Sequence, residues 1–486
     1  MQFERVIRGG TVVTESDVFK ADIGIAGGKI AALGHGLEAP DILDAHGLLV
    51  MPGGVDSHCH IDQVDPNNGY GAESFVSGTR SALAGGTTTV ISFVSQHRNE
   101  NIRDVLAETH RRATTSHIDY SFHQIITDPT DEVIHRDIPD IVASGIRSLK
   151  VFLTYDDARL NDTEFLKVLV AARRNGALVT VHCENYQAIG WLTEQLIAND
   201  LTQPKYHAWS RPKVIEREAT YRTIALAELV DQPIQIFHVS CSEVVEEIRR
   251  AQRRGLKVWA ETCPQYLVLT ASHMDRPGFE GAKFMCSAAP RDEVDHEGLW
   301  RDIREGTLGV ISSDHSAFNF TGERNSKDIN GTNASFDKIP NGVPGVGSRL
   351  PIVFSEGVSK GRIDLNTFVR VTSTNAARLF GLYPQKGTIA VGSDADLVLW
   401  DDQRRVTITN ELLQHAVDYT PYEGHEVTGW PVATLLRGEL AMHDGKIVNA
   451  SGSGRYLARD PYSYIDPTGI LPNDFDASRI PEGQTP

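Results

Sequence analysis

Apolar runs with the length of single β-strands recur along the middle of the chain. They alternate with longer stretches in which apolar residues return with the period of an amphipathic helix. The helical period covers residues 102–115, 162–175, 214–229 and 244–254. The eight strand-like runs cover residues 49–61, 87–94, 118–127, 148–155, 177–184, 233–240, 257–264 and 309–316.

This alternation predicts an α/β fold in which the parallel strands close into a (β/α)8 TIM-like barrel. An open, doubly wound sheet is the alternative, and the count of eight units favours the barrel. We expect the barrel to occupy residues 52–386 and to carry its active site at the carboxyl ends of the strands.

Both ends of the chain differ from the middle. Short β-type runs separated by glycines fill residues 1–51 and return at 387–390, 395–400, 433–438 and 445–448. We therefore predict that residues 1–51 and 387–450 form one smaller, discontinuous β-sandwich domain. Residues 451–486 are rich in Pro, Asp, Tyr and Gly, and we expect a C-terminal tail that is either at a subunit interface or partly disordered.

The composition excludes several classes of function. A net charge of −17 over 486 residues argues against nucleic acid or an anionic membrane as a partner. No apolar run approaches the roughly 18 residues of a membrane span, and no signal peptide is visible at the start. Five cysteines do not suggest a disulfide framework, so we expect a cytoplasmic protein.

Metal-ligand residue types stand where the predicted barrel strands end. His58 and His60 lie two positions apart at the end of one run, so an extended strand directs both rings to the same side. His182, His238 and Asp314 end three further runs. A single buried histidine is usually a hydrogen-bonded core residue, but the ends of all barrel strands meet at one mouth. Their convergence predicts a site for divalent metal.

Lys150 stands inside an apolar run. Burial disfavours the charged ammonium group, and the neutral amine can react with carbon dioxide. The resulting carbamate would offer two oxygens that could bridge two metals. The alternative is a lysine paired with a buried carboxylate. Strand alternation places Lys150 on the same face as Phe152 and Thr154, which we assign to the barrel interior.

Further segments are distinctive in sequence. They are 52–58 (PGGVDSH), 85–89 (GGTTT), 118–123 (IDYSFH), 148–152 (SLKVF), 181–185 (VHCEN), 261–267 (ETCPQYL), 339–342 (IPNG) and 418–424 (DYTPYEG). With the ligand set, they resemble the hydantoinase/dihydropyrimidinase family of the amidohydrolase superfamily, over nearly the whole chain.

The resemblance implies a binuclear metal centre. His58, His60 and Asp314 would hold the more buried metal, and His182 and His238 the second. A carboxylated Lys150 would bridge the two. Zinc is the expected ion because it suits a histidine-rich site, with manganese or cobalt as alternatives.

The resemblance also implies hydrolysis of the amide bond of hydantoins or dihydropyrimidines to N-carbamoyl amino acids. Tyr155, at the family's spacing from Lys150, would stabilise the oxyanion, although an ordinary rim aromatic is the alternative reading. Asp314 would carry a proton from the attacking water to the departing nitrogen. Backbone groups of Ser287 and Asn341 would hold the imide edge of this small cyclic amide. A homotetramer is the implied assembly, with a dimer as the alternative.

Two segments depart from the family pattern. Ala288-Ala289-Pro290 stands where a Pro-Pro pair is common, and the polar, acidic segment 61–70 replaces an apolar one that shapes the pocket for the ring substituent. We therefore expect the metal-dependent chemistry to be retained and the preferred ring substituent of the substrate to be unusual. An allantoinase-like enzyme or an imidase remains the alternative. A non-catalytic dihydropyrimidinase-related scaffold is disfavoured, because all six ligand positions are filled.

Overall fold

Eight parallel strands form a barrel in the computed structural model, which describes residues 2–65 and 69–469. The first and last strands meet just beyond their ends, where Cys59 bridges to His315 and the His60 N–H donates to the His315 carbonyl at 2.7 Å. This arrangement confirms the predicted barrel. In order around it, the strands are β6 (Gly54–Cys59), β9 (Thr87–Val94), β10 (Asp119–Ile125), β11 (Ser148–Phe152), β12 (Leu178–His182), β13 (Ile234–Ile236), β14 (Val258–Thr262) and β15 (Val310–Ile311).

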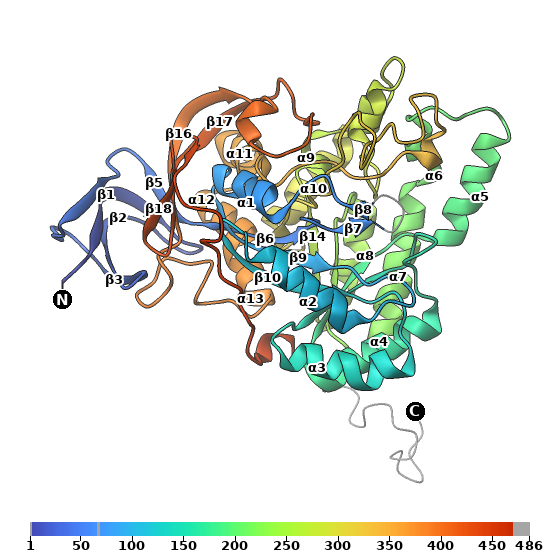
Figure 1. The fold of residues 1–486 in the computed structure, drawn as a ribbon, viewed down its shortest axis with the longest axis horizontal. Helices are drawn as coiled ribbons and strands as arrows, with labels where there is room; N and C mark the ends of the chain where they lie inside the picture. The colour runs from blue at the N-terminus through green and yellow to red at the C-terminus, as the bar shows by residue number, and fades with distance from the viewer. Residues whose placement is uncertain (1, 66–68, 470–486) are drawn as a thin grey trace, which may run out of the picture.

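Helices surround these strands (Figure 1). They are α1 (Phe75–Ala84), α2 (Ile102–Ala113), α3 (Ile138–Ala143), α4 (Asp162–Asn175), α5 (Tyr186–Ile197), α6 (Tyr206–Ser210), α7 (Lys213–Leu229), α8 (Ser242–Arg253), α9 (Gln265–Val268), α10 (Glu293–Arg304), α11 (Arg349–Val353), α12 (Leu365–Val369) and α13 (Asn375–Leu379). The four stretches with helical period correspond to α2, α4, α7 and α8. Local signals define α4 sharply, because Asn161 and Glu164 form a capping box and Gly176 ends the helix at φ 68°.

Strands from both ends of the chain form the separate smaller β domain that the sequence predicted as a sandwich, and in the structure it is built on one mainly antiparallel sheet. Its nine strands are β1 (Arg5–Val13), β2 (Val18–Ala26), β3 (Lys29–Gly34), β4 (Asp41–Asp44), β5 (Leu49–Pro52), β16 (Leu397–Thr407), β17 (Glu426–Leu436), β18 (Glu439–His443) and β19 (Lys446–Ile447). Strand β5 lies between β1 and β16 and so joins the N-terminal and C-terminal parts. Figure 1 shows the blue and red strands together at one end of the molecule.

Two predicted strands differ in the structure. The run 49–61 is divided into β5 of the terminal sheet and β6 of the barrel. The division falls at Gly53, whose N–H donates to the Asp396 carbonyl, whereas the next N–H, of Gly54, donates to Gly86. Residues 387–390 form no strand. Their apolar character has another cause, since Ile389 is buried in the core of the terminal sheet.

The C-terminal tail packs on the barrel over its described part, residues 451–469. The buried Arg459 donates to the Ser148 hydroxyl at 2.9 Å and to the Phe122 carbonyl. The remainder of the predicted tail, 470–486, lies outside the described residues. Within the described ranges, no helix has both the length and the apolar character that a bilayer span requires.

Candidate active site

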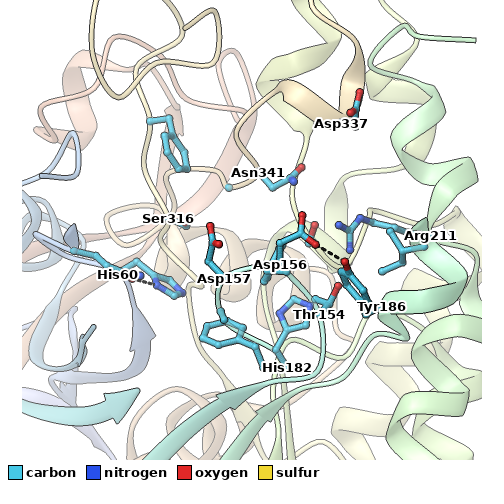
Figure 2. A pocket seen from close by; sticks show the side chains of 18 of the residues that line it. His60, Thr154, Asp156, Asp157, His182, Tyr186, Arg211, Ser316, Asp337 and Asn341 are labelled. Carbon is cyan, nitrogen blue, oxygen red and sulfur yellow. Dashed lines mark hydrogen bonds between the residues drawn. The ribbon is translucent and has the colours of Figure 1, made fainter. Parts of the chain in front are cut away.

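A cavity of about 710 Å³ opens at the carboxyl ends of the barrel strands. Every site residue that the sequence predicted lines it, so the structure brings the whole set together. These residues are His58, His60, Lys150, Tyr155, His182, His238, Ser287, Asp314 and Asn341. The cavity is seen from close by in Figure 2.

His58, His60 and Asp314 form one half of the candidate centre. The Asp314 Oδ1 atom lies 3.1 Å from His58 Nε2 and 3.4 Å from His60 Nε2. Burial alone would raise the pKa of Asp314, but the neighbouring His58 holds that pKa well below its usual range. An ionised carboxylate and two ring nitrogens within 4.8 Å of one another can ligate a single divalent ion.

His182 and His238 form the other half. His238 Nε2 lies 2.8 Å from His182 Nδ1, and the His238 ring lies 5.5 Å from that of His58 between centroids. Burial lowers the pKa of both histidines. Both rings are therefore held in the neutral form that binds metal.

A polar partner holds the outward nitrogen of three of these rings. His58 Nδ1 contacts Glu261, His60 Nδ1 contacts Gln63, and His182 Nε2 lies 2.8 Å from Glu184. Such partners fix the ring orientation and direct the other nitrogen to the metal. None of these three partners was among the predicted site residues. Glu261 and Glu184 had a usable signal, being acidic residues within apolar strand runs, whereas Gln63 had none.

Lys150 lies fully buried between the two halves. Its Nζ atom has no hydrogen-bond partner among the described residues, and it lies 4.2 Å from the ring centroid of Phe237 and 4.7 Å from that of Phe152. Desolvation lowers its pKa to about 7. The alternative of a lysine paired with a buried carboxylate is therefore not found. A buried amine without a hydrogen-bond partner, beside a set of candidate metal ligands, fits the prediction that carbon dioxide adds to this lysine.

Tyr155 lies at the rim of the centre, with its ring centroid 5.2 Å from that of His182. Burial raises the pKa of its hydroxyl, so the group remains a proton donor at neutral pH. Tyr155, His238 and Asp314 all have positive φ angles of 74°, 41° and 47°. Non-glycine residues in this region are strained, and such strain concentrates at functional sites.

Ser287 and Asn341 lie on the two segments that follow β14 and β15 in the chain, and both residues line the cavity. The buried Lys327 joins these segments, because its Nζ donates to the carbonyls of Met285 at 3.2 Å and Pro340 at 2.9 Å. The Gly342 N–H also donates to the Met285 carbonyl, at 3.0 Å. The backbone around both predicted substrate-binding positions is thus tied into one unit.

The segment that departs from the family pattern is only partly described. Asp62 forms an ion pair with Arg112 of α2 at 2.8 Å, so this acid is engaged outside the metal centre. Gln63 and Val64 line the cavity. The backbone continues into a small hairpin of β7 (Val64–Asp65) and β8 (Gly69–Tyr70), and residues 66–68 lie outside the described ranges.

Comparison with known proteins identifies the family. The model of the amidohydrolase family matches residues 49–447. A D-hydantoinase of Geobacillus stearothermophilus is 44% identical over 467 residues, which cover 95% of this chain and 98% of the relative. The chain belongs to the hydantoinase family of the amidohydrolase superfamily.

Solved hydantoinase-family structures share the fold. A dihydropyrimidinase from Brevibacillus agri matches with 42% identity and a TM-score of 0.91, covering 94% of this chain and 99% of that one. An L-hydantoinase from Arthrobacter aurescens matches with 28% identity and a TM-score of 0.86, over 94% of this chain and 100% of that one. Membership of the amidohydrolase family and the cluster of His58, His60 and Asp314 indicate a binuclear metal centre.

Proposed function

We propose that this protein is a metal-dependent cyclic amidase that hydrolyses hydantoins or dihydropyrimidines to N-carbamoyl amino acids. The convergence of six ligand-type residues at one barrel mouth carries this proposal. The named relatives support it, because they act on such rings and match nearly the full length of the chain.

The proposed centre would hold two zinc ions, with manganese or cobalt as alternatives. His58, His60 and Asp314 would hold one ion, and His182 and His238 would hold the other. A carboxylated Lys150 would supply the ligand between them. Its buried, unpartnered amine supports this assignment, because a pKa of about 7 leaves much of the amine neutral and able to react with carbon dioxide.

When bound, two such ions would lower the pKa of a shared water to about 7 and polarise the scissile carbonyl. Asp314 accepts a proton from the attacking water and delivers it to the departing ring nitrogen, because its depressed pKa keeps the carboxylate ionised, and so free to accept a proton, at neutral pH. The Tyr155 hydroxyl donates a hydrogen bond to the carbonyl oxygen as negative charge develops there. Backbone groups of Ser287 and Asn341 hold the imide edge, and Lys327 keeps their two segments together.

The proposal extends to the assembly, cellular setting and domain limits of the enzyme. The family likeness supports a homotetramer, with a dimer as the alternative. Five buried, unpaired cysteines fit a reducing compartment such as the cytoplasm. The proposed domain limits are 1–51 with 387–450 for the terminal domain and 52–386 for the barrel.

The test is ring opening by the purified protein, with metal content measured on the same sample. The substrates are hydantoin, dihydrouracil, phenylhydantoin, allantoin and succinimide. We expect turnover of the hydantoins or dihydrouracil with about two metal ions per chain. Exclusive turnover of allantoin or succinimide would instead support an allantoinase-like enzyme or an imidase. A protein that binds no metal and opens no ring, even with zinc and bicarbonate supplied, would refute the proposal.

A further inference from the structure

The position of the substrate's ring substituent follows from the barrel's geometry. The segments of Ser287 and Asn341 follow β14 and β15 in the chain, and the strands opposite these in the barrel order are β10 and β11. In a cyclic ureide, the imide nitrogen and the substituted carbon flank the scissile carbonyl on opposite sides. If the imide edge faces Ser287 and Asn341, the substituent faces the segments that follow β9, β10 and β11.

These segments form a wall that we define as the cavity-lining residues of 95–97, 125–127 and 152–158. Ile125 and Phe152 give it an apolar base, where they pack together in a small buried cluster. The rest of the wall is mostly polar. A ring substituent that fits it would have an apolar stem followed by a polar end.

Ser95 shows that this polarity is built into the wall. Its side chain is only 6% exposed, its hydroxyl has no hydrogen-bond partner among the described residues, and it lines the cavity. A buried hydroxyl without a partner costs free energy, so such groups are normally satisfied. This hydroxyl therefore indicates a hydrogen-bonding ligand on this side of the cavity.

The charges of the wall are negative. Asp156 accepts a hydrogen bond from the Tyr186 hydroxyl, whereas the exposed Asp157 has no ion pair or hydrogen bond within the described ranges. Figure 2 shows both carboxylates between His60 on one side and Tyr186 on the other. Of the lysine and arginine residues in the part of the chain that the structure describes, none belongs to this wall.

Nearby cations are engaged elsewhere. The Arg159 guanidinium lies 4.1 Å from the ring centroid of Tyr186, and Arg98 lies within 4.0 Å of Asp128 and Glu164. Neither arginine lines the cavity, and the two outer cations that do are paired with carboxylates, Arg211 with Glu184 at 2.6 Å and Lys338 with Asp337 at 3.1 Å. The negative charge of Asp157 is therefore available to a substrate.

We infer that the enzyme prefers cyclic ureides whose ring substituent is a short alkyl chain ending in a protonated amine. The inference rests on the proposed cyclic amidase function. The alkyl stem packs on Ile125 and Phe152. The ammonium group is met by the carboxylates of Asp156 and Asp157 and by the hydroxyl of Ser95. An anionic substituent of equal length meets two like charges and is disfavoured.

The test compares kcat/KM for hydantoins with aminopropyl, butyl and carboxyethyl substituents, with unsubstituted hydantoin as the reference. We expect aminopropyl hydantoin to exceed butyl hydantoin by about threefold to tenfold at low salt, since each carboxylate interacts with the amine across water. The preference should shrink in high salt, because exposed charges are screened. Carboxyethyl hydantoin should be the poorest of the three.

A substitution assigns the preference to one residue. Asp157→Asn keeps the shape of the side chain and removes its charge. We expect the ratio of kcat/KM for aminopropyl hydantoin to kcat/KM for butyl hydantoin to fall most of the way to one. Any general loss of activity cancels from this ratio. The control is Glu293→Gln on the outer helix α10, an exposed glutamate that does not line the cavity. It removes the same net charge and should leave the ratio unchanged.

The outcomes separate the two levels of inference. Turnover of unsubstituted hydantoin with butyl equal to or better than aminopropyl hydantoin would overturn the preference and leave the cyclic amidase function standing. A ratio that survives Asp157→Asn, or falls equally in Glu293→Gln, would overturn the assignment to this wall. Failure to open any of these rings, in protein that holds its metals, would instead reject the proposed function.

Discussion

Glu184→Gln tests whether the polar partners of the histidines hold the metal centre in shape. The Glu184 carboxylate is 1% exposed and accepts hydrogen bonds from Arg211 at 2.6 Å and from His182 at 2.8 Å. The substitution keeps the size of the side chain and removes its charge. The His182 ring then loses the carboxylate that orients it, and the Arg211 guanidinium remains buried without a paired carboxylate.

The expected magnitudes follow from these contacts. Loss of an orienting partner of a metal-binding histidine lowers metal affinity by about 10-fold to 100-fold. Removal of one member of a buried ion pair costs about 3–5 kcal/mol of unfolding free energy. Burial alone would raise the Glu184 pKa, but Arg211 and His182 lower it from 4.5 to about 2. Its stabilising contribution is therefore present above about pH 4.5 and is lost as pH falls through about 2, and the lowered pKa corresponds to about 3 kcal/mol, the lower end of that range.

The assay is a chelator titration with metal content per chain as the readout, followed by acid unfolding of the metal-free protein. Glu184→Gln should release about one metal ion at a chelator concentration that leaves the wild type loaded. The matched control is Glu218→Gln, an exposed glutamate of α7 that contacts Arg222 and Asn185 but no metal ligand. If Glu184→Gln retains its metals and its acid stability as the control does, the orienting role of Glu184 is wrong.

Three further substitutions test other parts of the site. Lys150→Ala should lose bound metal and catalytic activity together, and acetate or propionate should restore part of both. Metal content and turnover are measured on the same sample, and an active, fully metallated alanine variant would contradict the bridging role. Tyr155→Phe should lower kcat by about 10²-fold to 10³-fold with a smaller change in KM, as expected for a donor to the developing oxyanion. Steady-state kinetics measures both constants, and an unchanged kcat would contradict this role. Lys327→Met should raise KM more than it lowers kcat, because it frees the segments of Ser287 and Asn341 while leaving the metal ligands in place; an unchanged KM in a folded variant would show that these segments need no such tie.

The sequence predicted that the candidate ligands lie together because barrel strands place their ends at one mouth, whereas their role as metal ligands stays a prediction. His182 and His238 could be paired in space from strand order alone, although many residues separate them in the chain. The same reasoning could not find the contact between His58 and Glu261, because it depends on how two side chains on different strands meet inside the barrel. Nor could residue type reveal the positive φ of Asp314, which tertiary packing imposes.

Loop conformation was the least predictable part. The contact of Gln63 with His60 spans three positions in a segment without strand or helix period, so no periodic pattern signalled it. The polarity of segment 61–70 was evident, yet Asp62 pairs with Arg112 of α2. The run 49–61 predicts one strand because apolar residues stand on both sides of Gly53, but the hydrogen bonds change from one sheet to the other at this residue.

The placement of β5 has a consequence for biosynthesis. This strand leads directly into the one that bears His58, and its neighbour on one side is β16, made of residues 397–407. Until the ribosome has translated that distant segment, one edge of β5 has no partner and can pair with other chains. We therefore expect β5, which leads into the strand that bears His58, to gain its second neighbouring strand only when synthesis is nearly finished. Stable metal binding should then be a late event in the maturation of this enzyme.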